Sequence, residues 1–326
     1  APPASSAAAP TPSPAPVVTD EAPVTPPTEE ENHEYLMYQL GAVDETDEAP
    51  HVILTLPEGV QAAQLSQQTL GELVNAQAAL SITQGIVTTT LHYDFLYALL
   101  DEDGAGIVVS ITEVINDSEE RLYENAPIVF IAAEITITRD EQTVYTVGIP
   151  YAITVDMTGF VLYDMNPARF VLKVDGVPIG GSFDPQTGLF TAEALLYTGA
   201  FEIAYIPNLR RVNMGISSTT ITNAVYGDIT HMDILPVVVE NRTFIPIRFV
   251  AESLDATVKW NGERRRAVIV LDGITLEIYP DELLPGMDVP AFKQNDRIMI
   301  PLRFVAEYFN ATVNFQEETQ QIEIIL

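Results

Sequence analysis

The chain has 326 residues, a formal net charge of −31 and no cysteine. The lack of cysteine excludes disulfides, thiolate zinc sites and a cysteine nucleophile, and so acidic a chain is a poor partner for the phosphates of nucleic acid. No stretch of the sequence reaches the roughly eighteen apolar residues of a membrane-spanning helix. We therefore expect neither a nucleic-acid partner nor a membrane span.

Charge is spread unevenly along the chain. Residues 1–120 contain no Lys or Arg, whereas eleven of the fifteen basic residues lie at or after Arg210. A solvated acidic surface explains this pattern, and so does head-to-tail contact between an acidic front and a less acidic back.

The first 34 residues are rich in Pro, Ala, Ser, Thr and Glu and carry almost no large apolar side chain. Such a segment cannot bury enough surface to fold, so we predict a disordered linker or assembly tail. The start at Ala1, without a methionine, fits removal of a signal peptide, although a trimmed sequence would look the same. The next residues, Tyr35, Leu36, Met37 and Tyr38, are predicted to be strand-like and suited to strand addition on a neighbouring subunit.

Residues 35–207 are predicted to form a β-rich domain of short strands. A strand, a short helix and a strand are expected within residues 65–83, and the same plan recurs within residues 90–112. A hairpin is expected at residues 177–192, with its turn at 184–188. The weak duplication predicts a pseudo-symmetric β core covered by two helices.

Part of this region resembles a β-domain that recurs in bacterial surface-layer and cell-surface proteins. The resemblance rests on GGSFDPQTGLFTAEALLYTGAFEIAYI, on IPYAITVD and on the strand–helix–strand pair, and it covers roughly residues 60–207. It implies a β-sandwich-like extracellular module with a structural or adhesive role, and it brings no catalytic residues.

Residues 208–326 contain an internal duplication. RTFIPIRFVAESLDATVKW, residues 242–260, returns 55 residues later as RIMIPLRFVAEYFNATVNF, with eleven of nineteen positions identical. Each copy is predicted to be a strand, a short helix and a strand, in two repeats at about 209–271 and 272–326, and the proline suits a first helical position. The residues that we assign to the structural motif are Arg242, Pro246, Arg248, Phe249, Glu252 and Trp260 in one repeat and Arg297, Pro301, Arg303, Phe304, Glu307 and Phe315 in the other.

Three details of the repeats give further expectations. Arg248 stands four residues before Glu252, as Arg303 does before Glu307, and this spacing indicates either an Arg that ties the helix to strand carbonyls or an anion site. Trp260 closes the first copy where Phe315 closes the second, which favours core or edge packing over a sugar platform. The stretches 267–271, 274–278 and 322–326, which are rich in apolar and β-branched residues, predict sheet strands, so the chain should end in a paired strand.

The duplicated motif R-x-x-(I/V)-P-x-R-F-V-A-E-x-x-x-A-x-V-x-(W/F) resembles the copper amine oxidase N-terminal-like stalk domain. The resemblance covers about residues 209–326 and includes the pairs Met232-Asp233 and Met287-Asp288 before the two copies. It implies a small α+β module of extracellular and cell-wall proteins that acts as a spacer or binding module. It does not imply copper or oxidase chemistry, because the oxidase's Asn-Tyr-Asp/Glu motif and histidine cluster have no counterpart here.

Candidate ligand sites are few. Asp101 and Asp103 open a DEDG segment that resembles the start of a calcium loop, but the EF-hand positions five and twelve fall on Ala105 and Thr112. We expect no cofactor, with calcium as the weak alternative to an acidic turn. Arg264, Arg265 and Arg266 form the one basic cluster, suited to an anionic wall polymer or an acidic patch on a neighbouring subunit, or else an ordinary charged turn.

These observations predict a mainly β protein with α+β character that is not an enzyme. The preferred function is an extracellular structural subunit of a bacterial surface assembly, a fibre or an S-layer-like sheet, that polymerises with copies of itself. The alternative is a stalk-mounted adhesin or a module that binds a cell-wall polysaccharide. A third hypothesis, an extracellular hydrolase fragment, requires a convergent nucleophile and base, and the sequence shows none.

Overall fold

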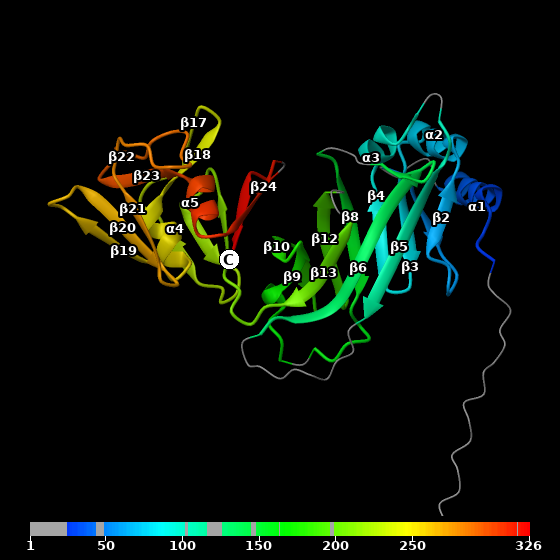
Figure 1. Cartoon of the computed structure of the whole chain (residues 1–326), viewed down its shortest axis with the longest axis horizontal. Helices are drawn as coiled ribbons and strands as arrows, with labels where there is room; N and C mark the ends of the chain where they lie inside the picture. The colour runs from blue at the N-terminus through cyan, green and yellow to red at the C-terminus, as the bar shows by residue number, and fades with distance from the viewer. Residues whose placement is uncertain are drawn as a thin grey trace, which may run out of the picture.

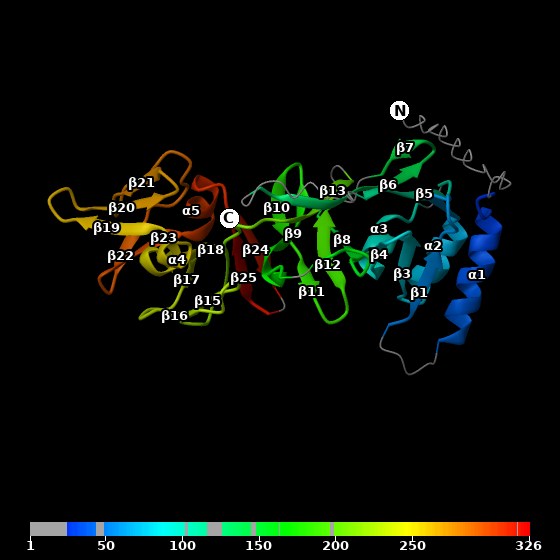
Figure 2. The ribbon, with the colours of Figure 1, turned by 90° about the horizontal axis from the view of Figure 1, so that it is seen from below.

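The computed structural model confirms a mainly β chain with a few short helices (Figure 1). The structure describes residues 25–43, 49–101, 104–115, 126–144, 148–162, 164–195, 199–317 and 319–326. Two groups of sheets follow each other along the longest axis of the molecule, and Figure 2 shows the same order from below. In the part of the chain that is described, no helix has the length and apolar character needed to cross a membrane.

The first group is a pair of sheets that share one hydrophobic core, and we call it the sandwich. Among its paired strands, only β1 and β3 run parallel. One sheet has the order β1 (His51–Thr55), β3 (Ala79–Gln84), β4 (Val87–Leu91), β8 (Pro150–Asp156), β12 (Leu189–Leu195) and β11 (Ser182–Asp184). The other has the order β10 (Val177–Gly180), β9 (Phe170–Val174), β13 (Ala200–Tyr205), β6 (Ile128–Arg139), β5 (Ile107–Ile115) and β2 (Ala62–Leu65), with β7 (Gln142–Thr143) on β6.

The two predicted strand–helix–strand units are present. The first is β2, α2 (Gln67–Asn75) and β3, and the second is β4, α3 (Tyr93–Ala98) and β5. Each unit starts in one sheet and ends in the other, so its helix crosses between the layers. The Ser66 hydroxyl caps α2 by accepting from the Thr69 N–H at 2.9 Å, which satisfies one of the helix's free donors.

The predicted hairpin at residues 177–192 is correct in its turn but not in its first strand. Gly180 and Gly181 have φ of 134° and 99°, a backbone that other residues rarely adopt. There the chain leaves one sheet as β10 and enters the other as β11, so one predicted strand is two.

The second group, which we call the repeat unit, has its own core of residues between Val212 and Ile324. Its helices are α4 (Ile247–Ser253) and α5 (Leu302–Tyr308). Its three sheets are β16 (Ile229–His231), β15 (Thr220–Asn223), β14 (Arg211–Gly215), β25 (Gln321–Ile325) and β24 (Thr312–Gln316); then β17 (Val237–Val239), β18 (Arg242–Pro246), β23 (Arg297–Pro301) and β22 (Phe292–Gln294); and then β19 (Thr257–Asn261), β20 (Arg266–Leu271) and β21 (Ile274–Ile278).

The two repeats meet at an antiparallel pair of identical strand positions. Ile245 of β18 lies opposite Ile300 of β23, and these two residues are equivalent in the duplication. Both side chains are fully buried. The pair therefore marks a pseudo-two-fold axis, and the chain ends, as predicted, in a paired strand, β25.

Candidate assembly surface

The N-terminal assembly segment is a helix and not a strand. Residues 35–38 lie within α1 (Glu29–Ala42), so the strand prediction was wrong. Thr28 caps this helix: its hydroxyl accepts from the Glu31 N–H, and the Glu31 carboxylate accepts from the Thr28 N–H at 2.7 Å. The spacing Thr-x-x-Glu is a capping-box signal that the sequence carried and that outweighs the β propensity of two tyrosines.

The predicted tail is also shorter than expected. Its last residues, from Glu29 to Glu34, are helical, whereas residues 1–24 lie outside the described residues. Within α1, Leu36 is fully buried in the sandwich core, while Tyr35 and Tyr38 are 51% and 77% exposed. Met37 is partly buried against the same core. The four predicted residues thus divide between packing and an exposed surface.

The inward face of α1 covers the free edges of both sheets. The Asn32 side chain donates to the Gln64 carbonyl of β2 at 3.0 Å. The Gln39 side chain donates to the Ile53 carbonyl of β1 at 2.7 Å and accepts from the Ile53 N–H at 2.8 Å. Unpaired strand edges invite pairing with other chains, so α1 protects this end of the sandwich. Asn32 and Gln39 are not among the residues predicted from the sequence, although their spacing from Leu36 places them on one helix face.

The opposite edge, β10, is covered by the repeat unit. The Thr312 hydroxyl donates to the Pro178 carbonyl at 2.6 Å, and the Asn314 side chain donates to the Ile179 carbonyl at 2.8 Å. The same Asn314 amide donates to Glu323 at 2.9 Å, which fixes its orientation. A side chain at Gly180 would approach Asn314, so glycine permits the close contact.

A second contact reinforces this junction. The Asn166 side chain donates to the Val225 carbonyl at 2.8 Å, and Arg169 donates to the Tyr226 hydroxyl at 3.1 Å. Arg211 is buried beside Glu323, with Nε 3.2 Å from Oε1, although the pair lacks hydrogen-bond geometry. Burial lowers the pKa of the Arg211 guanidinium, and Glu323 opposes that shift. The sandwich and the repeat unit are therefore joined by specific polar contacts rather than by a free linker.

The motif arginines form reciprocal ion pairs across the pseudo-two-fold axis. Arg242 of the first repeat binds Asp288 of the second, and Arg297 of the second binds Asp233 of the first. Hydrogen bonds from these arginines hold the pKa of Asp233 and Asp288 below the ordinary value of 3.8. Phe249 lies under the Arg297 guanidinium, 5.8 Å from ring centroid to Cζ. This exchange explains why an aspartate precedes each copy of the motif.

The rest of the motif shapes the helix starts. Pro246 and Pro301 are N-cap residues with non-helical ψ angles of 99° and 120°, so the predicted first helical position was one residue early. Each proline ends a strand and sets the turn into the helix, which begins at Ile247 or Leu302. Phe304 is buried in the core of the repeat unit.

The charged residues of the motif helices stay at the surface. Arg248 lies 3.8 Å from Glu252, and neither Arg248 nor Arg303 donates to a strand carbonyl among the described residues. Glu307 is exposed, as is Arg303. The expectation that these arginines tie helix to strand is not supported.

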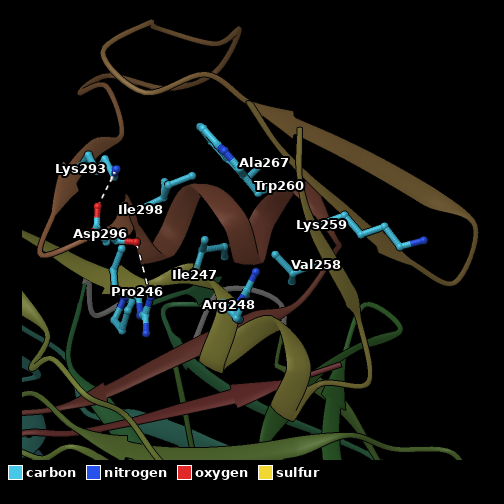
Figure 3. Close-up of a pocket in the computed structure, with 11 residues that line it drawn as sticks. Pro246, Ile247, Arg248, Val258, Lys259, Trp260, Ala267, Lys293, Asp296 and Ile298 are labelled. Carbon is cyan, nitrogen blue, oxygen red and sulfur yellow. Dashed lines mark hydrogen bonds and ion pairs between the residues drawn. The ribbon is translucent and has the colours of Figure 1, made fainter. Parts of the chain in front are cut away.

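Trp260 and Phe315 lie on edge strands and are 47% and 46% exposed. Trp260 borders a cavity of 270 Å³ between the two repeats, whose floor includes Ile247 and Val258 (Figure 3). Arg248 points toward this cavity, and the ion pair of Lys293 with Asp296, at 2.7 Å, stands at its rim. Lys259 extends away from the other lining residues.

The arginine cluster is divided by the fold. Arg266 binds Glu277 and donates to the Tyr279 hydroxyl at 3.0 Å, so its charge is used within the chain. Arg264 and Arg265 are exposed in the turn between β19 and β20. Only two of the three predicted residues are therefore available for a partner.

The calcium hypothesis gains no support from the described residues. Asp101 accepts from Arg139 at 3.0 Å, and Asp103 lies outside the described residues. Among the residues that the structure describes, no group of three or more His, Asp or Glu side chains is arranged to hold a metal ion.

The fold defines a β-rich protein that joins a two-sheet sandwich to a duplicated α+β unit. Residues 224–324 match the family model described as copper amine oxidase N-terminal domain. The matched residues lie within the repeat unit, and the match does not include the sandwich. No match was found among curated proteins or among solved structures.

Proposed function

We propose that the protein is a non-enzymatic structural subunit of an extracellular bacterial surface assembly, a fibre or an S-layer-like array built from copies of this chain. The proposal rests on the observation that edge strands at both ends of the sandwich are covered. At one end α1 covers β1 and β2, and at the other the repeat unit covers β10. Covered edges prevent uncontrolled pairing, while the polar junction holds the two parts in line.

An elongated unit with defined ends is suited to repetitive stacking. The acidic α1 and the hairpin β19–β20 lie at opposite ends of the long axis (Figures 1 and 2). Contact between unlike surfaces of identical subunits continues into a filament when it does not close into a ring. The extracellular location and the bacterial origin are part of this proposal and rest on the two family resemblances.

Sedimentation velocity and electron microscopy of the purified chain test the proposal. We expect the sedimentation coefficient to rise with protein concentration, and ordered fibres or sheets to appear at low salt. A chain that remains monomeric at every concentration and salt condition would contradict the structural function.

The cavity beside Trp260 supports a second candidate, a module that binds an anionic cell-wall polysaccharide. An exposed indole offers a stacking surface, and Arg248 points to the same space, which suits a sugar that carries a carboxylate or phosphate. Titration of the wild-type chain and of Trp260→Ala with purified wall polymer tests it. Saturable binding that the substitution abolishes supports the candidate, and equal binding by both proteins contradicts it.

A further inference from the structure

The two repeats present equivalent hairpins, and only one hairpin is covered. In β24–β25, Thr312 lies opposite Ile325, and in β19–β20, Thr257 lies opposite Val270. Both members of the second pair lie 55 residues before those of the first, as in the sequence duplication. We call Thr312, Asn314, Glu323 and Ile325 the covered face, and their equivalents Thr257, Lys259, Val268 and Val270 the open face.

The covered face shows what such a hairpin can do. It binds the sandwich edge through Thr312 and Asn314, and Ile325 is 1% exposed. On the open face the equivalent Val270 is 39% exposed, and Thr257 and Lys259 are exposed as well. The same backbone surface that docks in one repeat is therefore exposed in the other.

The side chains of the open face indicate an acidic partner. Lys259 replaces Asn314, and within the described part of the chain it forms no ion pair. The exposed Arg264 and Arg265 stand at the end of the same hairpin, whose residues 257–271 carry four basic side chains and one Glu. In a chain of net charge −31, this hairpin is a local excess of positive charge.

The outward face of α1 has the complementary chemistry. Glu31, Glu34, Tyr35 and Tyr38 share one side of the helix and are all exposed, and we call them the helix face. The helix has four Glu and no Lys or Arg. The helix and the open face lie at opposite ends of the molecule (Figures 1 and 2).

We infer that the open face of one copy docks on the helix face of the next, with Lys259 pairing with Glu34 and Val270 packing on the tyrosines. This inference rests on the proposed structural function and names its contact. The covered face closes one end of a sandwich within the chain, and the open face meets the other end of the neighbouring sandwich. Because the two surfaces differ and lie at opposite ends, the contact repeats along a filament.

A charge exchange tests the contact in the full chain. Lys259→Glu and Glu34→Lys each place like charges together, and each should weaken self-association at least about tenfold in sedimentation velocity at low salt. Arg303→Glu and Glu317→Lys are matched controls, since each reverses one charge at an exposed position outside both faces. These controls should associate as the wild type does.

Mixing the two weakened variants supplies the decisive readout. In a mixture of Lys259→Glu and Glu34→Lys chains, every contact between unlike chains pairs opposite charges, so association should return to within about threefold of the wild type. Circular dichroism checks that each variant is folded. If the wild type associates and each variant associates as well as the wild type does, the inference is overturned while the structural function stands. A wild type that never associates overturns both.

Discussion

The two repeats of the C-terminal unit share a motif and a fold but have different surroundings. The second repeat uses its outer hairpin to bind the sandwich edge through Thr312 and Asn314. The first repeat places Lys259 where the second has Asn314, and its hairpin is open. The duplication produced two equivalent hairpin surfaces that differ at a few outward positions, and one of them contacts the sandwich while the other is exposed.

The largest effect should come from the position that the repeats share most closely. Ile245→Ala and Ile300→Ala each remove a fully buried side chain at the pseudo-two-fold axis. Each should lower the free energy of unfolding by about 2–5 kcal/mol. Guanidinium denaturation measures both, and a cost for one variant that is several times the cost for the other would contradict the symmetric core.

Equivalent substitutions in the two hairpins, only one of which lies at the junction, should have different effects on stability. Asn314→Ala leaves the Ile179 carbonyl and Glu323 without their shared donor, so it should cost about 1–3 kcal/mol. Its equivalent, Lys259→Ala, removes an exposed side chain and should change stability by no more than about 0.5 kcal/mol in dilute protein. Equal losses in the two variants would show that the covered and open faces do not differ as described.

We expect a smaller loss of stability when a contact of the edge-covering helix α1 is removed. Gln39→Ala removes both hydrogen bonds to Ile53 and should cost about 1 kcal/mol. Amide hydrogen exchange at Ile53 should become faster. Glu30→Ala, on the exposed side of the same helix, is the control and should leave that amide unchanged. Unchanged exchange in Gln39→Ala would contradict the role of α1 as an edge cover.

The reciprocal ion pairs give the smallest effect, which depends on pH. The pKa of Asp233 and of Asp288 lies below 3.8 in the folded chain. The two ion pairs therefore contribute fully to the stability of the fold above pH 3.8. This contribution is lost as the pH falls through the lower pKa that the two carboxyl groups have in the folded chain.

The variant Asp233→Asn/Asp288→Asn begins without this contribution. Between pH 4 and 2 its melting temperature should fall less than that of the wild type. Asp228→Asn serves as control, because Asp228 forms no ion pair with a described residue. Parallel melting curves for wild type and double variant would contradict the prediction.

The sequence predicts most of the fold because the relevant signals are local. Runs of apolar and β-branched residues identify strands such as β20 and β21, and the duplicated motif predicts both helices of the repeat unit. The predictions that failed also have local causes, because a second local signal outweighed the one on which each prediction was based. Around Tyr35 the capping box formed by Thr28 and Glu31 outweighs β propensity, and at Gly180 the backbone divides a single apolar run between two sheets.

The contacts that form the candidate surface are harder to predict from the sequence. The pairing of Arg242 with Asp288 and the docking of Asn314 on Ile179 join residues that are far apart in the chain. The arginine cluster looked continuous, yet Glu277 engages Arg266 from the next strand. Which repeat is covered depends on packing against the sandwich, and the motif itself is nearly the same in both.

A site-specific cross-link tests the central claim most directly. The chain has no cysteine, so Lys259→Cys/Glu34→Cys introduces the only two thiols. With a short bifunctional maleimide, the account predicts a ladder of dimers, trimers and longer products, and none from the control Lys293→Cys/Glu34→Cys. Monomers alone from the first variant, under conditions in which it still sediments as a polymer, would contradict end-to-end docking of the open face on α1.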